Sequence, residues 1–142
     1  NEWASAEEMF ARFESRAPFD RWDRGVLKDY CDYALNGKVL ACPPAFEASG
    51  YENSTAASAN VHDVVQKLDI PVVIIRAPGM LPDGTLDLSV SPTDPKLVTR
   101  FPNAREEVWS DTSHFIPMEQ PARVAALIQD FILRTRLGPG GG

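Results

Sequence analysis

The first part of the chain has the periodicity of two amphipathic helices. Ser5-Ala6-Glu7-Glu8 has the form of a capping box, and apolar residues follow it on one helical face until Pro18: Met9, Phe10 and Phe13. A second run begins near Asp23, and its apolar positions recur at spacings of three and four: Val26, Leu27, Tyr30, Cys31 and Ala34. Asn36-Gly37 is suited to cap this run. The pattern predicts a helical hairpin over the first 36 residues.

The segment that follows has a weaker pattern. Lys38 to Cys42 predicts a short extended piece, and Pro43-Pro44 favours an edge or cap strand because proline has no N–H for the ladder. Residues 47–60 are small and polar, which favours a loop. The apolar face that resumes after them predicts a short helix: Val61, Val64, Val65 and Leu68.

The second half alternates strand and helix patterns. Residues 70–75 are a β-branched run typical of a strand buried in a parallel sheet, and a Pro/Gly-rich connection follows over 77–95. We expect a short helix over 96–101, a strand over 105–109, a loop over 111–117 and an amphipathic helix over 121–136. This order predicts an α/β fold with a parallel sheet. Because two strands cannot cover their own faces, we expect the other strands to lie outside these residues.

Composition and charge narrow the classes of function. Hydrophobic residues at 44% and charged residues at 24% suit one folded domain. A net charge of -6 and a pI near 4.8 argue against nucleic acid as a partner. No apolar run has the roughly 18 residues of a membrane helix, and no secretory signal is visible. Cys31 and Cys42 lack a metal-binding spacing, which predicts reduced cysteines in an intracellular, cytoplasmic protein without a metal or another cofactor.

One segment is the most informative: Trp109-Ser-Asp-Thr-Ser-His114-Phe-Ile-Pro-Met-Glu-Gln-Pro121. It resembles the end of the α/β-hydrolase fold, where a Ser-His-Phe or Gly-His-Phe loop follows the last strand and precedes a proline and a final helix that begins near Glu-x-Pro. Residues 70–76 resemble the penultimate strand, and the helical hairpin with Cys42-Pro-Pro-Ala-Phe-Glu47 resembles the end of a cap. The resemblance implies an incomplete α/β-hydrolase fold: a helical cap segment and connection over 1–69, the C-terminal part of the core over 70–137 and a flexible tail over 138–142.

The resemblance implies a serine-type hydrolase of esters, lactones or related acyl compounds, with His114 as the general base. A neutral imidazole can accept the serine proton and return it to the leaving group. The family's serine lies in a Gly-x-Ser-x-Gly elbow upstream of the histidine, and these 142 residues contain no such motif. Ser49 lacks the first glycine and is expected in polar coil, and Ser113 is too close to His114 along the chain to face it easily. We therefore expect the serine in a missing N-terminal half or a companion chain, and the isolated chain to be inactive.

The catalytic acid has three candidates after the penultimate strand: Asp83, Asp87 and Asp94. Asp83 lies in Pro82-Asp-Gly84, a compact turn that could expose a carboxylate, although Asp-Gly is also an ordinary turn dipeptide. We take Asp83 as the candidate acid and leave open that the true acid precedes Asn1. Asp111 is expected to cap its own loop instead.

Other interpretations remain open. Aromatic residues in the first helices suit a cap over a small apolar acyl substrate, but core packing explains them better: Trp3, Phe10, Phe13, Trp22 and Tyr30. The missing elbow favours a non-catalytic binding or interaction module as the main alternative, and a transferase of the same fold would use the same base. His62 falls on the polar side of its helical pattern and is given no role.

Overall fold

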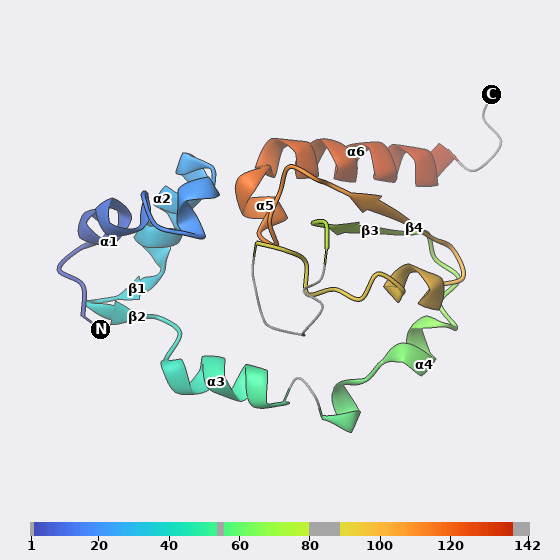
Figure 1. The fold of residues 1–142 in the computed structure, drawn as a ribbon, viewed down its shortest axis with the longest axis horizontal. Helices are drawn as coiled ribbons and strands as arrows, with labels where there is room; N and C mark the ends of the chain where they lie inside the picture. The colour runs from blue at the N-terminus through green and yellow to red at the C-terminus, as the bar shows by residue number, and fades with distance from the viewer. Residues whose placement is uncertain (1, 54–55, 80–88, 138–142) are drawn as a thin grey trace. The chain divides into compact units, whose positions relative to one another are not determined.

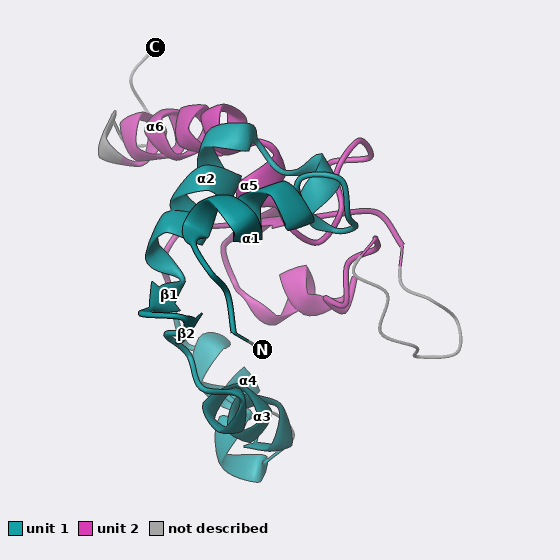
Figure 2. Cartoon of the chain, turned by 90° about the vertical axis from the view of Figure 1, so that its left-hand side faces the viewer, with its two compact units in different colours: residues 1–68 teal, residues 69–142 magenta. Residues whose placement is uncertain are grey.

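The computed structural model of the chain describes residues 2–53, 56–79 and 89–137 (Figure 1). These residues belong to two compact units, Asn1–Leu68 and Asp69–Gly142, which Figure 2 colours separately. The division falls next to the expected boundary between residues 69 and 70. The expected tail over 138–142 lies outside the described residues.

The first unit opens with helix α1, Ala6–Phe13, whose N-terminus is capped as the sequence predicts. The Ser5 hydroxyl accepts the Glu8 N–H at 3.2 Å, and the Glu8 carboxylate accepts the Ala4 N–H at 2.7 Å. The first bond satisfies an N–H group that the first turn of a helix leaves without a partner, and the second holds the residue before the N-cap against the helix. Helix α2, Arg24–Tyr33, begins in the same way, because Asp23 accepts the N–H groups of the second and third helical residues.

Helices α1 and α2 contact each other through a small core, which confirms the predicted helical hairpin. Met9, Leu27 and Cys31 are fully or almost fully buried. Next to them, four aromatic rings follow one another at centroid distances of 4.2–5.5 Å: Phe13, Phe19, Trp22 and Tyr30. This mutual packing supports the core interpretation of Phe13 and Trp22, whereas Tyr30 is 38% exposed.

The predicted end of the second helix is wrong. Helix α2 stops at Tyr33, and strands β1, Leu35–Asn36, and β2, Val39–Leu40, form an antiparallel hairpin. Its two-residue turn contains Gly37, whose φ of 65° lies in the left-handed region. Glycine at the first position of a two-residue turn favours a hairpin just as glycine after a helix favours a cap, and here the pairing of Asn36 with Val39 decides between the two. The extended piece expected over 38–42 is correspondingly short.

The loop expected over residues 47–60 is also wrong in part, because helix α3 runs over Pro44–Asn53. Pro44 occupies the first helical position, where its fixed φ and missing N–H are tolerated. The helix has no buried residue, so it carries no apolar periodicity that a sequence pattern could detect. The short helix expected after it is present as α4, His62–Val65.

The second unit contains the two predicted sheet strands. Strand β3, Val72–Arg76, pairs in parallel with β4, Ala104–Val108, in the register Val72 to Ala104 and Arg76 to Val108. Between them lies a short 3₁₀ helix, Leu97–Arg100, and after them come helices α5, Ile116–Glu119, and α6, Pro121–Leu137 (Figure 1). The broad α/β class is therefore confirmed.

The strand pair and the last helix keep apolar side chains accessible. Ile70, two residues before β3, and Val108 in β4 are 53% and 45% exposed, and on α6 Ile128 and Leu133 are 52% and 60% exposed. The described residues add no third strand to the β3–β4 sheet. Parallel sheets are normally covered on both faces. This unit therefore leaves exposed apolar side chains of the kind that such sheets normally bury. No helix within the described ranges is long and apolar enough to cross a membrane.

Candidate functional site

His114 lies in the loop that joins the end of β4 to α5. The loop starts at Trp109, which is 3% exposed and whose N–H donates to the Arg76 carbonyl at 3.0 Å, continuing the strand pairing by one residue. Thr112 then donates its hydroxyl to the Trp109 carbonyl at 2.9 Å. These bonds turn the chain sharply after the carboxyl end of the strand. In open α/β sheets, ligands bind at this end of the parallel strands.

Ser113 and Glu119 fix the loop on the other side of His114. The Ser113 N–H donates to both oxygens of the Glu119 carboxylate at 3.1 and 3.2 Å, and the Ser113 hydroxyl also donates to Glu119. The same hydroxyl accepts the Phe115 N–H at 3.2 Å. Because Ser113 is 2% exposed, these bonds hold the residues on both sides of His114 in place. Its hydroxyl is committed to the carboxylate, so Ser113 is not a suitable nucleophile.

A second set of contacts joins the same loop to α6. The Arg123 guanidinium lies over the Trp109 ring, 3.7 Å from its centroid, and pairs with Asp111 at 3.0 Å. The indole N–H of Trp109 donates to Glu107 at 3.2 Å. Hydrogen bonds from Arg105 and then from Trp109 hold the pKa of Glu107 below its ordinary value. Asp111 therefore ties the loop to α6 through Arg123, whereas the sequence predicted a cap within its own loop.

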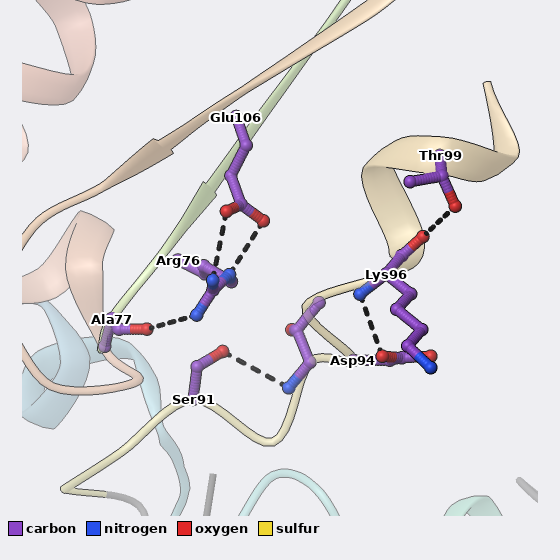
Figure 3. A network of polar contacts seen from close by, with 8 residues as sticks. Arg76, Ala77, Ser91, Asp94, Lys96, Thr99 and Glu106 are labelled. Atoms are coloured by element: carbon purple, nitrogen blue, oxygen red, sulfur yellow. Dashed lines mark hydrogen bonds and ion pairs between the residues drawn. The ribbon is translucent and has the colours of Figure 1, made fainter. Parts of the chain in front are cut away.

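Arg76 ends strand β3 and pairs with Glu106 on the neighbouring strand (Figure 3). Its Nε and Nη2 donate to the two carboxylate oxygens at 2.7 and 3.0 Å, and its Nη1 donates to the Ala77 carbonyl at 3.4 Å. The two side chains are 12% and 19% exposed. The bonds to Glu106 raise the pKa of Arg76 above its ordinary value, so the guanidinium is fully charged.

A pocket of about 150 Å³ lies beside His114, and we call it the His114 pocket. Its polar lining comes from three segments of the second unit: Arg76, Ser91, Thr93 and His114. Its apolar lining comes from two of these segments: Ile75, Ala77, Ile116 and Pro117. His114 itself is exposed, and within the described ranges no side chain hydrogen-bonds to its imidazole. The ring is therefore accessible to a ligand in the pocket.

The structure separates the three candidate acids. Asp83 and Asp87 lie outside the described residues. Asp94 is exposed, and it accepts the Lys96 N–H at 2.9 Å at the start of the 3₁₀ helix. That bond is a local turn contact, so Asp94 has a structural role (Figure 3). Of the carboxylates that the structure describes, none is bonded to His114.

Ser49 and His62, which the sequence analysis rejected as site residues, lie in the first unit. Ser49 is part of helix α3 rather than polar coil, and its carbonyl accepts the Asn53 amide at 2.8 Å. His62 is exposed at the start of α4. In the described part of the chain, no group of three or more His, Cys, Asp or Glu side chains could hold a metal ion.

Sequence reasoning did not single out Arg76, Ser91 or Thr93 as pocket residues. Arg76 had a detectable signal, because it ends a buried strand at the edge where His114 was expected. Ser91 and Thr93 lie in the Pro/Gly-rich connection, where no periodicity indicates which side chains turn inward.

No family model matches the chain, and no curated protein or solved structure shows a significant similarity to it.

Proposed function

We propose that this chain is the C-terminal part of a serine-type α/β-hydrolase that acts on a small apolar acyl compound such as an ester or a lactone. One observation carries the proposal. His114 is an exposed imidazole at the carboxyl end of a parallel strand pair, on a loop that is anchored on both sides and beside a partly apolar pocket. Substrate sites in α/β folds form at this edge.

His114 would act as the general base. Its neutral imidazole would accept the proton of an attacking serine hydroxyl and later donate that proton to the leaving group. The anchored loop supports this role, because proton transfer requires the base to be held within hydrogen-bond distance of the nucleophile. The apolar pocket lining would exclude water from part of the acyl chain.

The nucleophile is proposed to come from polypeptide outside these 142 residues, either an N-terminal part of the same fold or a companion chain. The support is that the sequence lacks Gly-x-Ser-x-Gly and that the two-stranded parallel sheet keeps apolar side chains accessible. The proposed acid, Asp83, belongs to a segment outside the described residues. We expect the isolated chain to show no turnover of p-nitrophenyl esters.

A serine-directed fluorophosphonate probe tests this function. The protein encoded together with its upstream sequence should be labelled, and His114→Ala should slow labelling by about a hundredfold or more. His62→Ala is the matched control and should label at the rate of the parent protein. Equal labelling of the parent and His114→Ala would refute the role of His114. Ester hydrolysis by the isolated chain that disappears in His114→Ala would refute an external nucleophile.

The alternative proposal is a non-catalytic binding or interaction module. The exposed apolar residues of the second unit favour it, because accessible apolar patches mark interaction surfaces. A complete protein that is not labelled by the probe, yet binds a ligand in the His114 pocket, would favour this alternative. A transferase would be labelled like a hydrolase but would pass its acyl group to an acceptor other than water.

A further inference from the structure

The described lining of the His114 pocket contains several hydrogen-bond donors and no carboxylate. Four of its lining side chains can donate: the Arg76 guanidinium, the hydroxyls of Ser91 and Thr93, and the His114 imidazole. No aspartate or glutamate is found among the described residues that line it. A pocket of this composition is complementary to a ligand that accepts hydrogen bonds and carries negative charge.

Arg76 has unused hydrogen-bond donors despite its pair with Glu106. A guanidinium has five N–H donors, and the bonds to Glu106 and Ala77 use three of them. The other two have no acceptor among the described residues. Because the side-on contact to Glu106 uses Nε and Nη2, the end of the guanidinium formed by Nη1 and Nη2 remains open to a two-oxygen group.

Ser91 is the second donor that points to a ligand. It is 2% exposed, and its oxygen accepts the Thr93 N–H at 3.2 Å (Figure 3). This bond occupies a lone pair and leaves the hydroxyl hydrogen without an acceptor in the described part of the chain. A buried donor without a partner is unfavourable, so a ligand oxygen in the pocket would remove this cost.

We propose that the His114 pocket binds a small carboxylate with a short hydrocarbon chain. The planar carboxylate matches the open end of the Arg76 guanidinium and accepts from Ser91, while Ile75, Ile116 and Pro117 contact the chain. The pocket volume of about 150 Å³ is that of several water molecules at about 30 Å³ each, which is enough for a carboxylate with a short hydrocarbon chain. Identifying the ligand as the acid released by ester hydrolysis rests on the proposed function, whereas carboxylate binding itself does not.

The test is a titration of the 142-residue chain with butyrate and, in parallel, with its neutral isostere butyramide, followed by ¹H–¹⁵N and His side-chain NMR. Butyrate should produce saturable shifts at Ala77, Ser91 and Thr93 and at the His114 ring, and butyramide should bind at least tenfold more weakly. Inorganic phosphate at equal ionic strength is the third arm. Phosphate binding equal to or tighter than butyrate would overturn the assignment to a carboxylate.

Two variants test the mechanism of binding. Ser91→Ala should raise the Kd for butyrate about tenfold, because it removes one hydrogen bond to a charged group. Glu106→Gln should lower the Kd several-fold, because it leaves the Arg76 charge without its neutralising carboxylate. Thr99→Val, which changes a hydroxyl outside the pocket, should leave the Kd unchanged.

The variant results separate binding from folding. Folding is checked by the NMR spectrum of each variant, and Glu106→Gln remains informative if Ser91→Ala unfolds. Weaker butyrate binding by a folded Glu106→Gln, or equal binding of butyrate and butyramide, would overturn the proposal. A protein that binds butyrate but is not labelled by the fluorophosphonate probe would retain this site while refuting the hydrolase. Probe labelling of a protein that does not bind butyrate would support the hydrolase and overturn the carboxylate site.

Discussion

The Ser113 N–H lies 3.1 Å from one oxygen of the Glu119 carboxylate and 3.2 Å from the other, so a single acidic side chain bridges the loop of His114 to helix α5. The Ser113 hydroxyl donates to the same carboxylate. The Glu119 of the Glu-x-Pro pattern therefore positions the loop residue that precedes the histidine. Its role is to position the loop, because these bonds fix the residue next to His114.

Replacing Glu119 should destabilise the protein and loosen this loop. Glu119→Ala removes the acceptor for two buried donors of Ser113, so we expect the free energy of unfolding to fall by about 2 kcal/mol. Glu119→Gln keeps one acceptor oxygen and should lose about half as much. Urea denaturation measures both values, with Glu52→Gln on the exposed face of α3 as the control. An unchanged midpoint for Glu119→Ala would contradict the role given to this carboxylate.

Arg123 should contribute more to stability than an ordinary surface arginine. It lies 3.7 Å from the centroid of the Trp109 ring and also pairs with Asp111, whereas Arg134 makes an exposed pair with Asp130 four residues earlier. We expect Arg123→Ala to lower the free energy of unfolding by about 1 kcal/mol. Arg134→Ala should lower it clearly less, because exposed ion pairs contribute little to stability. Thermal denaturation of the two variants in parallel checks the difference, and equal losses would argue against the cation–π contact.

Two glycines provide a pair of substitutions with opposite expected signs. Gly37 has a φ of 65° in the hairpin turn, so Gly37→Ala should destabilise by about 1 kcal/mol although nothing lies within 4 Å of the added methyl group. Gly50 lies inside helix α3 with equally open surroundings, so Gly50→Ala should stabilise that helix by up to about 1 kcal/mol. Urea denaturation should therefore show opposite shifts. Stabilisation by Gly37→Ala would contradict the left-handed turn.

The sequence predicted elements where apolar residues repeat, and it failed where they do not. Met9, Leu27 and Cys31 on the predicted apolar faces of α1 and α2 are buried, and the β-branched run before Arg76 forms strand β3. Helix α3 was missed because it buries no side chain and therefore has no period to detect. At Asn36-Gly37 the local signal fits both a helix cap and a hairpin turn, and only the pairing of Leu35 with Leu40 decides between them.

The candidate site was predictable to a similar extent. The order of elements predicts that His114 follows the last strand, and the structure places this residue in an exposed loop after β4. Ser91 reaches the same pocket from a connection without regular structure, so its position depends on tertiary contacts that no local pattern encodes. Asp83 lies outside the described residues, and its role stays a prediction.

The two cysteines should differ sharply in reactivity and in their effect on stability. Both thiols are free, but Cys31 is buried in the core of the first unit while Cys42 is exposed, so only Cys31 is a small hydrophobic residue of the predicted kind. Burial raises the pKa of Cys31 above its ordinary value, because the thiolate would lose its hydration. The disulfide reagent DTNB should therefore modify one thiol rapidly at pH 8, and Cys42→Ser should abolish that rapid phase.

The raised pKa of Cys31 also predicts the direction of a pH effect. The unfolded thiol ionises near pH 8.5, whereas the folded thiol stays protonated to a higher pH. The contribution to stability is therefore fully present below about pH 8.5 and is lost as the pH rises through the folded pKa. The free energy of unfolding measured from pH 7 to 9.5 should fall at the alkaline end in the parent and in Cys42→Ser, and less steeply in Cys31→Ala. The same slope in all three proteins would show that the buried thiol does not cause the loss.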